Sequence, residues 1–424
     1  MTESNCYDVL IVGAGQAGIP LAHDLAKAGK RVALAEEKHL GGSCVNFGCT
    51  PTKAVIASAR VAHLARRGKE FGLKIPTVEV DFPAVLERAK RILMDSRNSL
   101  RKGFEKTDNP KLLPGSARFE GREVDAFRVA IGNQVLLAEQ VVLDTGTRST
   151  IPPIEGLDSV KFICAENWLE SIELPKHLAI IGGGYIGLEM SQFYRRMGSR
   201  VTVIEAAGQV AGDEDHDVAS ALQRLLETEG IECLLNARVK RVEINDGKPK
   251  ITIERDNESF AMEASHVFVA TGRTPNTEDL GLETVGVKVS DRGIVEANDR
   301  LATNVEGIWV AGDIRGGPMF THTSWDDYRI LLSQIAGDGS RTTDRVVPYA
   351  IFTDPQLGRV GMTESEARNS GKEIKTAHYE MKSNGRAREF GETEGFIKVI
   401  VDGASSEPQF SHVRVQSWSI CMWI

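Results

Sequence analysis

The fold is decided near the start of the chain, where residues 8–18 read Asp8-Val9-Leu10-Ile11-Val12-Gly13-Ala14-Gly15-Gln16-Ala17-Gly18. The first five residues form a short apolar run that is typical of a buried parallel strand. Three glycines with G-x-G-x-x-G spacing follow, and residues 19–28 are predicted to form a helix that ends at Gly29. A second predicted strand at 31–35 ends in Glu36. This order of strand, glycine loop, helix, strand and acid is the dinucleotide-binding fingerprint.

Each part of the fingerprint has a physical role in binding a dinucleotide. Gly13, Gly15 and Gly18 let the backbone approach a pyrophosphate at the N-terminus of the helix. Glu36 is expected to accept hydrogen bonds from the adenosine ribose. A glycine turn with a purely structural purpose is the weaker alternative, because it would not require the flanking strands or the acid.

The same pattern occurs a second time in residues 177–205. An apolar run at 177–181 precedes Gly182-Gly183-Gly184-Tyr185-Ile186-Gly187, and a predicted helix ends at Gly198 before a strand that ends in Glu205. In both copies the third glycine and the helix-ending glycine are eleven residues apart, and the acid follows seven residues later. Because both spacings agree, we predict two nucleotide-binding modules rather than one module and a chance motif.

A pair of cysteines lies soon after the first fingerprint, in Gly41-Gly42-Ser43-Cys44-Val45-Asn46-Phe47-Gly48-Cys49-Thr50-Pro51-Thr52-Lys53. Residues five apart in an ideal α-helix have Cα atoms roughly 8.6 Å apart, whereas a disulfide needs about 4.4–6.8 Å. A disulfide between Cys44 and Cys49 would therefore need a tightened or bulged backbone, and Gly48 is expected to supply the freedom. A loop this short stabilises a fold by only ~2 kcal/mol. A redox-active dithiol is thus a better interpretation than a structural staple, with two small buried residues as the alternative.

Composition limits the class of protein. The chain has 424 residues, a net charge of −8, 41% hydrophobic and 26% charged residues, as in ordinary globular proteins of two to four domains. The acidic balance argues against nucleic acid or an anionic membrane as a partner, and no apolar run has membrane-spanning length. We therefore expect a cytoplasmic protein. Four of its six cysteines have no close-spaced partner and are expected to be structural or incidental: Cys6, Cys164, Cys233 and Cys421.

The segment 41–53 closely resembles the redox-active motif of the flavoprotein disulfide reductases, the family of dihydrolipoamide dehydrogenase, glutathione reductase and mercuric reductase. The resemblance extends through most of the chain and includes 113–117, 141–146, 267–276, 307–313 and a mercuric-reductase-like stretch at 320–329. It implies an α/β fold with two Rossmann-like, three-layer nucleotide-binding domains, of which the FAD domain is discontinuous. An α+β dimerisation domain would follow.

The resemblance also implies domain boundaries. Residues 1–150 and 275–345 would form the FAD-binding domain, 151–274 the NAD(P)-binding domain, and 346–424 the dimerisation domain. The resemblance stops after about residue 403, and 404–424 show no helical or strand period. Family members carry a His-Pro pair and a glutamate there, which reach the partner subunit's disulfide, but none of the nine histidines here precedes a proline. We expect a truncated or frame-shifted end and an incomplete homodimer interface; a divergent but folded terminus is the alternative.

Site residues carry over from the family position by position. Cys49 would contact the flavin and Cys44 would exchange with the substrate, Lys53 and Glu189 match an ion pair near flavin N5, and Tyr185 matches the aromatic gate over the nicotinamide pocket. The residues expected to bind FAD are Gly13, Gly15, Gly18, Glu36, Gly42, Ser43, Lys53, Gly115, Thr145, Gly146, Gly312 and Asp313. Those expected to bind NAD are Gly182, Gly184, Gly187, Glu205 and Gly272, and no metal ligands are expected.

The family's activity would carry electrons from NAD(P)H through FAD to a Cys44–Cys49 disulfide and on to a disulfide or similar thiol-reactive acceptor. Glu205 would face the 2′-phosphate of NADPH, and Ala206 and Ala207 supply no cation, so NADH is expected over NADPH. Two alternatives stay open. A mercuric reductase acting on Hg(II) should carry a second cysteine pair near its C-terminus, which this chain lacks. A flavin-binding remnant would be impaired in catalysis.

Overall fold

The computed structural model describes residues 6–403 and 413–415. The chain forms two compact units, and each unit is assembled from segments that are far apart in the sequence. The first unit contains the described residues of Met1–Pro51, Ala89–Arg148 and Arg273–Arg345, and the second contains those of Thr52–Arg88, Ser149–Gly272 and Val346–Ile424. Two long helices, α3 (Cys49–Arg66) and α4 (Phe82–Glu105), have residues in both units.

A seven-stranded sheet forms the centre of the first unit. Its strands follow the order β3 (Lys111–Pro114), β2 (Val32–Glu36), β1 (Cys6–Val12), β6 (Gln134–Leu143), β5 (Ala126–Ile131) and β4 (Ala117–Glu123), and β16 (Ile308–Val310) pairs with the end of β6. The strands β3, β2, β1, β6 and β16 are parallel, whereas β4, β5 and β6 pair antiparallel. Because β16 joins from a distant part of the chain, this module is discontinuous in sequence, as the resemblance predicted.

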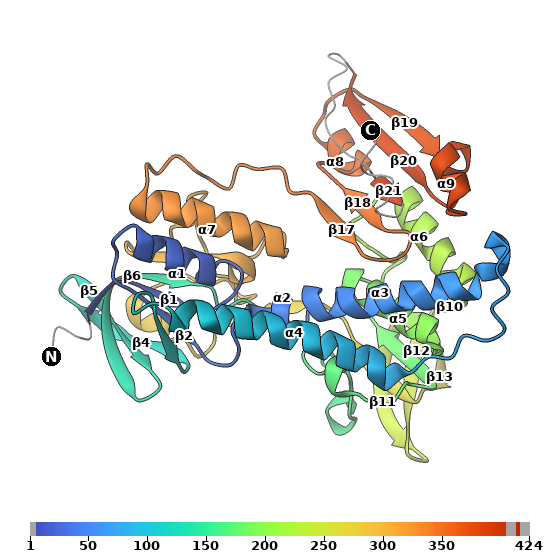
Figure 1. The fold of residues 1–424 in the computed structure, drawn as a ribbon, viewed down its shortest axis with the longest axis horizontal. Coiled ribbons are helices and arrows are strands. Elements are labelled where there is room, and N and C mark those ends of the chain that lie inside the picture. The colour runs from blue at the N-terminus through green and yellow to red at the C-terminus, as the bar shows by residue number, and fades with distance from the viewer. Residues whose placement is uncertain (1–5, 404–412, 416–424) are drawn as a thin grey trace. The chain divides into compact units, whose positions relative to one another are not determined.

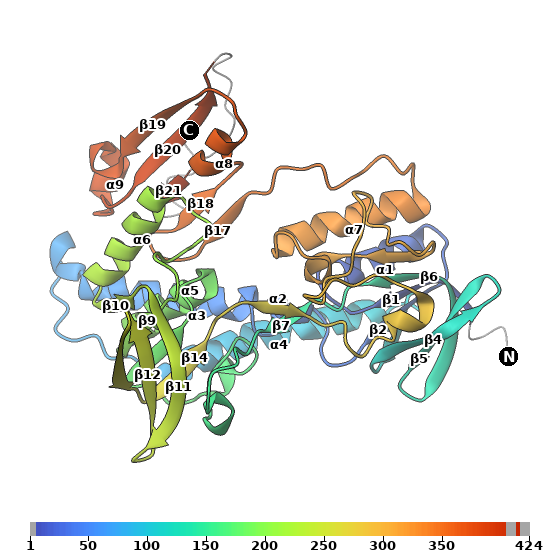
Figure 2. The same cartoon turned by 180° about the vertical axis from the view of Figure 1, so that it is seen from behind.

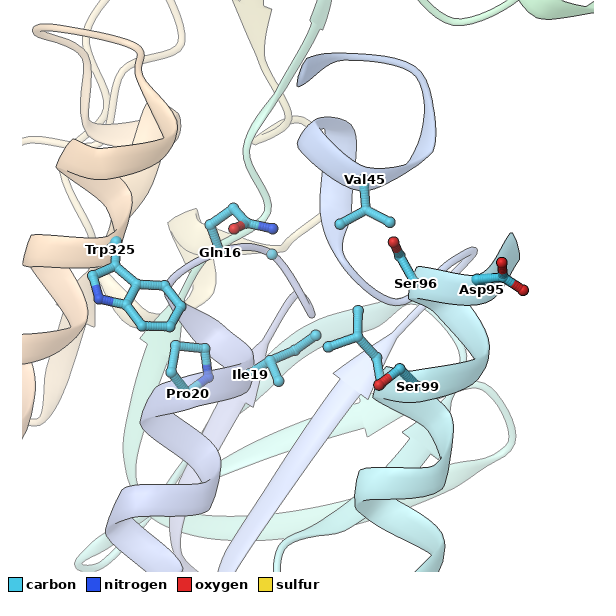
Figure 3. Close-up of a pocket in the computed structure, with 10 residues that line it drawn as sticks. Gln16, Ile19, Pro20, Val45, Asp95, Ser96, Ser99 and Trp325 are labelled. Atoms are coloured by element: carbon cyan, nitrogen blue, oxygen red, sulfur yellow. The ribbon is translucent and has the colours of Figure 1, made fainter. Parts of the chain in front are cut away.

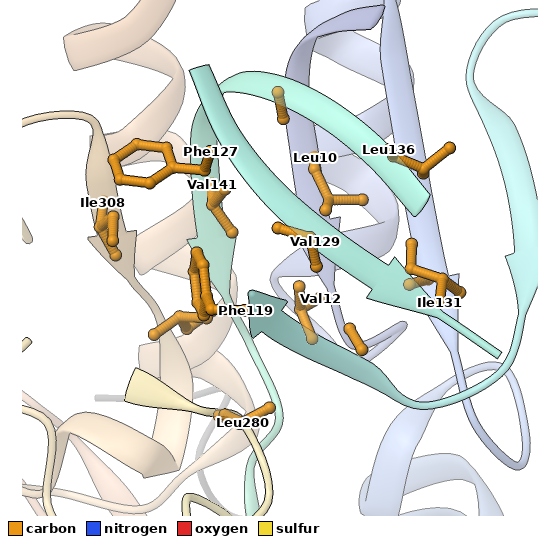
Figure 4. Packing of buried hydrophobic residues seen from close by; sticks show 14 of the residues in the cluster. Leu10, Val12, Phe119, Phe127, Val129, Ile131, Leu136, Val141, Leu280 and Ile308 are labelled. Atoms are coloured by element: carbon orange, nitrogen blue, oxygen red, sulfur yellow. The ribbon is translucent and has the colours of Figure 1, made fainter. Parts of the chain in front are cut away.

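Both faces of this sheet are buried, and alternate residues of β1 show how. Val9 and Ile11 pack in a cluster with α1 (Gly18–Lys27) and α7 (Thr321–Ala336), two helices that lie side by side (Figure 1). Leu10 and Val12 point to the other face, where Phe127 and its neighbours in β4, β5 and β6 form a second cluster (Figure 4). Because successive side chains of a strand point to opposite faces, one apolar run serves both clusters.

The second unit contains the repeated module. Its parallel sheet has the order β10 (Ile231–Leu234), β9 (Arg200–Ile204), β8 (His177–Ile181) and β14 (His266–Val269), with α5 (Tyr185–Met197) and α6 (His216–Thr228). Between β10 and β14 the chain forms a three-stranded antiparallel sheet of β11 (Ala237–Asn245), β12 (Lys248–Arg255) and β13 (Glu258–Glu263) (Figure 2). The strand–helix–strand order predicted for both copies is confirmed.

The last sheet of the second unit is antiparallel and has five strands. Their order is β17 (Tyr349–Ile351), β18 (Leu357–Arg359), β21 (Val413–Val415), β20 (Phe396–Asp402) and β19 (Ile374–Glu380), with short helices α8 (Glu364–Asn369) and α9 (Gly385–Glu389). The strand β21 lies within 404–424, where the sequence shows no helical or strand period. Backbone pairing to β18 and β20 defines it, and three residues are too few for a sequence period to show. The predicted truncation and the incomplete interface lie outside the described residues.

Buried ion pairs attach this sheet to the second nucleotide-binding module. Lys398 of β20 is 1% exposed, and its Nζ lies 3.1 Å from Asp215 and 2.8 Å from Glu364. Asp354 accepts a hydrogen bond from Arg196 of α5 at 2.6 Å and also pairs with Arg60 of α3. Charges this deeply buried are tolerated only when they are paired.

The remaining elements are short. In the part of the chain that the structure describes, they comprise α2 (Gly42–Asn46), the paired strands β7 (Thr147–Ser149) and β15 (Arg273–Pro275), and 3₁₀ turns at Gly68–Phe71, Leu157–Ser159, Trp168–Glu170, Leu282–Val285, Gly312–Arg315 and Met381–Ser383. Among the described residues, no helix combines the length and the apolar character that crossing a membrane requires.

Candidate active site

The first glycine loop connects β1 to α1 in a conformation that excludes side chains. Gly13 has φ +107°, and a Cβ there would lie 2.2 Å from the backbone oxygen of Asp144. A Cβ on Gly18 would lie 2.2 Å from the backbone oxygen of Gly13. Glu36, at the end of β2, accepts a hydrogen bond from Ala14 N at 2.8 Å. The loop and the acid are therefore held together as one unit.

The second glycine loop has the same construction. Gly182 has φ +109°, and its Cβ would lie 2.3 Å from the backbone oxygen of Ala270. A Cβ on Gly187 would lie 2.1 Å from the backbone oxygen of Gly182. Glu205 accepts hydrogen bonds from Gly183 N at 2.6 Å and from Ala207 N at 2.7 Å. Both carboxylates are thus fixed at the end of their strand by the loop beside them.

Three further segments predicted to take part end at the same side of the first sheet. Gly115 follows β3, Thr145 and Gly146 follow β6, and Gly312 and Asp313 follow β16. Thr145 donates to the backbone oxygen of Asn276 at 2.8 Å, and Asp313 accepts from Thr147 Oγ1 at 3.2 Å. In parallel sheets the carboxyl ends of strands meet at one edge, where ligands bind. The structure therefore brings these residues to the edge that carries the first glycine loop.

The segment that carries the two cysteines packs directly on the first glycine loop. Gly41 N donates to Ala14 O at 2.8 Å, and the side chain of Gln16 donates to Gly41 O at 3.0 Å. A Cβ on Gly42 would lie 3.0 Å from Gly15 Cα. Ser43 follows as part of α2. The predicted dithiol and the predicted pyrophosphate loop are neighbours in one packed structure.

The backbone between the two cysteines is bulged, as a short connection required. Cys44 lies in α2 and Cys49 is the first residue of α3. Gly48 N donates to Ser43 O, five residues earlier, at 2.7 Å. We expected Gly48 for its backbone freedom, but its φ is not positive. It is required for space instead, because a Cβ would lie 2.9 Å from Ser43 O.

Cys49 has a contact that the sequence did not reveal. Its Sγ lies 3.2 Å from the hydroxyl oxygen of Thr321, the first residue of α7. A hydroxyl group can donate a hydrogen bond to a thiolate. The other described cysteines lie in different surroundings. Burial raises the pKa of Cys164 to about 11 and that of Cys233 to about 12, and Cys6 lies exposed in β1.

A pocket of about 560 Å³ lies beside the first glycine loop (Figure 3). Gln16, Val45 and Trp325 come from three different parts of the first unit, and α1 and α4 supply most of the rest. The full lining is Gly15, Gln16, Ile19, Pro20, Val45, Asp95, Ser96, Ser99, Leu100 and Trp325. None of these side chains is cationic. Because Val45 follows Cys44 in α2, one wall of the pocket is built by the dithiol segment.

The second unit carries the predicted ion pair. Lys53 Nζ lies 2.7 Å from Glu189 Oε2, and the other carboxylate oxygen of Glu189 accepts from Phe352 N at 2.9 Å. The ammonium group also lies 4.4 Å from the centre of the Phe352 ring. Tyr185 is the first residue of α5 and is 37% exposed, and Gly272 has φ +131°.

Comparison with known proteins decides the family. Residues 7–327 match the model of the pyridine nucleotide-disulphide oxidoreductases, and residues 347–407 match the dimerisation domain of the same family. The chain belongs to this family. Its enzymes are FAD-dependent and use NAD(P)H, and the chain is an oxidoreductase of this type with a dimerisation domain.

Relatives of known name agree with this assignment. The probable pyridine nucleotide-disulfide oxidoreductase RclA of Escherichia coli is 35% identical over 94% of this chain and 87% of its own length. A dihydrolipoyl dehydrogenase of Cupriavidus necator is 33% identical over 97% and 89%. The solved structure of the Cu(II) complex of the HOCl-induced flavoprotein disulfide reductase RclA from Escherichia coli has a TM-score of 0.86 at 34% identity and covers 96% of this chain and 89% of that chain. A mercuric reductase of Lysinibacillus sphaericus is 29% identical over 97% and 75%.

Sequence reasoning missed two residues of this family member's site. Asp144 stands immediately before Thr145 and Gly146, both predicted, and its carboxyl group lies under the first glycine loop. A comparison of the two modules could have found Asp144, because the corresponding residue of the second module is the uncharged Ala270. Thr321 gave no sequence signal, since it is 272 residues from Cys49.

Proposed function

We propose that Cys44 and Cys49 form the disulfide that receives electrons from FAD, and that Cys44 passes them to a small disulfide or another thiol-reactive acceptor. The observation that carries the proposal is the packing of the dithiol segment on the first glycine loop, through Gly41 and Ala14 at 2.8 Å. In a member of this family, that loop is the one expected to hold the flavin dinucleotide. Cofactor and dithiol would then share one support.

FAD supplies hydride acceptance from the nicotinamide and two-electron reduction of the disulfide when it is bound. The residues present fit this group, because the loop has no room for side chains and Glu36 is held beside it. Gly13, Gly15 and Gly18 would approach the pyrophosphate, and Glu36 would bind the ribose. We propose as further FAD-binding residues Gly42, Ser43, Lys53, Gly115, Thr145, Gly146, Gly312 and Asp313.

The dithiol can complete a two-electron reduction of the acceptor by itself. The thiolate of Cys44 attacks one sulfur of an acceptor disulfide, which forms a mixed disulfide and releases the first acceptor thiol. The thiolate of Cys49 then attacks Cys44, which releases the second thiol and closes the Cys44–Cys49 disulfide. The acceptor gains two electrons and two protons, and the dithiol loses both. Thr321, 3.2 Å from Cys49, can stabilise the second thiolate by a hydrogen bond.

The pocket beside Val45 is our candidate entry for the acceptor. Its lining contains apolar groups, among them Trp325, uncharged polar groups such as Ser96 and Ser99, and one carboxylate, Asp95. These side chains supply no cation, so an anionic acceptor could be compensated only by backbone amides of the glycine loop, which we assign to the FAD pyrophosphate. We therefore propose that the acceptor is an uncharged or cationic compound rather than a polyanionic disulfide.

For the nicotinamide cofactor we propose NADH. Gly182, Gly184, Gly187 and Gly272 would hold it, and Tyr185 would cover the nicotinamide. Glu205 is fixed by two backbone hydrogen bonds of 2.6 and 2.7 Å and cannot turn aside without losing them. A carboxylate held there accepts hydrogen bonds from a ribose 2′-hydroxyl but repels a 2′-phosphate. By the family resemblance, Lys53 and Glu189 would tune the charge near flavin N5.

The proposal is tested with FAD-loaded full-length protein. NADH should support reduction of an uncharged cyclic disulfide in the native protein and in Cys6→Ser, which removes an exposed cysteine outside the segment. Cys44→Ser should abolish it while NADH still bleaches the flavin absorbance. Equal turnover of Cys44→Ser and Cys6→Ser would refute the role of the dithiol, and equal rates with NADPH would refute the role of Glu205.

A metal ion is the second candidate acceptor. A relative is named mercuric reductase, and the RclA structure is titled a Cu(II) complex. In the part of the chain that the structure describes, no group of three His, Cys, Asp or Glu side chains could hold a metal ion. Among the described residues, the Cys44–Cys49 pair is our candidate site for reaction with a metal acceptor. NADH oxidation driven by Hg(II) or Cu(II), but by no disulfide, would favour this candidate.

The boundaries predicted for the FAD-binding, NAD-binding and dimerisation domains remain our proposal, as does assembly into a homodimer with an incomplete interface. Static light scattering tests the second point. A stable dimer at micromolar concentration would show that the interface is complete.

A further inference from the structure

Asp144 and Ala270 occupy the same position in the two modules. Asp144 follows β6 and its N donates to Val12 O at 2.8 Å, while Ala270 follows β14 and its N donates to Ile181 O at 2.8 Å. In each module the backbone oxygen of this residue lies against the first glycine of the loop. A Cβ on Gly13 would lie 2.2 Å from Asp144 O, and a Cβ on Gly182 would lie 2.3 Å from Ala270 O. The backbone contacts are the same in the two modules. The modules therefore differ here only in the side chain, which is a carboxyl group in Asp144 and a methyl group in Ala270.

The carboxyl group of Asp144 fills the space under the first glycine loop. Its Oδ2 accepts a hydrogen bond from Gly18 N at 2.8 Å. A Cβ on Gly15 would lie 2.7 Å from Oδ2, and one on Gly312 would lie 2.8 Å from Oδ1. In the second module a Cβ on Gly184, the counterpart of Gly15, would meet nothing within 4 Å. The carboxyl group therefore sits between two segments that we assign to FAD, with 7% of the residue exposed.

The charged groups around Asp144 are mainly acidic. Glu36 comes from β2, Asp313 from the turn after β16, and Asp327 from α7. Asp327 is paired with two cations, since it accepts from Arg315 at 2.9 Å and from Arg345 at 2.6 Å, and Arg273, a cation near Asp313, donates to Thr147. Burial raises the pKa of Asp144 well above its ordinary value, the Gly18 amide opposes this, and the neighbouring carboxylates add to it.

We propose that the carboxyl group of Asp144 controls how tightly the first module holds FAD. As the acid, it can donate a hydrogen bond to the dinucleotide while it accepts one from Gly18. As the carboxylate, it has no proton to donate and repels the pyrophosphate. The second module has no such control, because Ala270 cannot ionise. The inference rests on the assignment of FAD to the first module.

The sign of the effect follows from the charge. Retention of FAD is strongest while Asp144 is protonated and falls as the pH rises through its pKa. A hydrogen bond to a charged group changes affinity by about 10- to 100-fold, so the affinity for FAD should fall by that factor across the transition. Asp144→Asn keeps the shape and the acceptor for Gly18 N but cannot ionise, and it should remove the pH dependence.

The experiment measures release of FAD rather than turnover. Full-length FAD-loaded protein is diluted at a series of pH values across the whole range in which it stays folded, and the fluorescence of released flavin gives the dissociation constant. The native protein should lose affinity about 10- to 100-fold with rising pH, while Asp144→Asn should stay level. Asp144→Ala, which copies the second module, should also stay level. If the native curve is flat, or if Asp144→Asn follows the native curve, the inference is wrong.

A reciprocal variant keeps the test independent of the folding of the Asp144 variants. Ala270→Asp should make the affinity for NADH fall with rising pH, whereas the native affinity for NADH should not depend on this position. The outcomes also distinguish failure of this inference from failure of the assignment of FAD to the first module. A native protein that binds no FAD at any pH refutes both, and one that binds FAD equally well at all pH values refutes only the role of Asp144.

Discussion

Glu214 offers a sharp test of how the second module is joined to the C-terminal sheet. It precedes α6, is 6% exposed, and neither carboxylate oxygen has a hydrogen-bond partner in the described part of the chain. Arg359 Nε, in β18, lies 3.5 Å away. Burial raises the pKa of Glu214 from 4.5 to about 7, against the attraction of Arg359, and Asp215 adds to the shift.

The cost of ionising Glu214 can be worked out from these values. In the unfolded chain the carboxyl group ionises near pH 4.5, whereas in the folded protein it stays protonated up to about pH 7. The free energy of unfolding therefore falls as the pH rises from 4.5 to 7, and ionisation of Glu214 lowers it no further above about pH 7. At 1.36 kcal/mol per pH unit it amounts to about 3 kcal/mol. Glu214→Gln cannot ionise and should escape this loss.

The assay is thermal unfolding of the native protein and Glu214→Gln at pH 5 and pH 8.5. The gain of the variant should be about 2–3 kcal/mol larger at pH 8.5, which is about 4–12 °C for a unit of this size. Asp215→Asn is the matched control of opposite sign, because hydrogen bonds from the backbone of Glu364 and Ser365 outweigh burial and lower the pKa of Asp215. Its cost should be largest at neutral pH and shrink in acid. An equal effect of Glu214→Gln at both pH values would refute the reasoning.

Three further predictions concern the dithiol and the C-terminal sheet. Peptide mapping of oxidised protein without reductant should find Cys44 joined to Cys49; if both remain alkylatable after oxidation, the redox assignment fails. Thr321→Val should raise by about 1–2 pH units the midpoint at which Cys49 is alkylated in a Cys44→Ser background, since a hydrogen bond to a thiolate contributes about 1.5–3 kcal/mol; Thr321→Ser should restore it, and an unchanged midpoint would dismiss the hydrogen bond. Lys398→Met should destabilise the second unit by about 3–5 kcal/mol because it removes the cation that pairs with the buried carboxylate of Asp215, whereas the same change at exposed Lys382 should have little effect on the melting temperature.

The two nucleotide-binding modules could be predicted because their signals are local. An apolar run, three glycines and an acid lie within about thirty residues of one another in each copy, and each residue's role depends on its neighbours in sequence. The observed strands β1 and β8 and the helices α1 and α5 accordingly lie close to their predicted positions. The discontinuity of the first module was predicted only through the family resemblance, since no local signal pairs β16 with β6.

Contacts between segments that are distant in sequence, in the site and outside it, could not be predicted from such local signals. Thr321 meets Cys49, and Lys398 meets Asp215, across long stretches of chain, so their partners depend on how whole elements pack. The reason for Gly48 was also hidden, because the sequence suggests a special φ while the structure shows a steric requirement against Ser43. Sequence therefore predicts which residues react but not what surrounds them.

Comparison of the two repeated modules helps to find such contacts, which no single motif can do. The two modules share the glycine spacing, the acid that accepts from the loop, and the backbone contact of Gly13 or Gly182 with the strand that returns to the loop. Requirements common to any dinucleotide must lie in what they share, and requirements of one cofactor must lie where they differ. Under the loop the difference is the side chain of Asp144, which is costly to bury and is opposed by neighbouring carboxylates. A group that costs stability where a methyl group suffices in the sister module is most simply explained by a task specific to the flavin, and the pH dependence of FAD release measures that task directly.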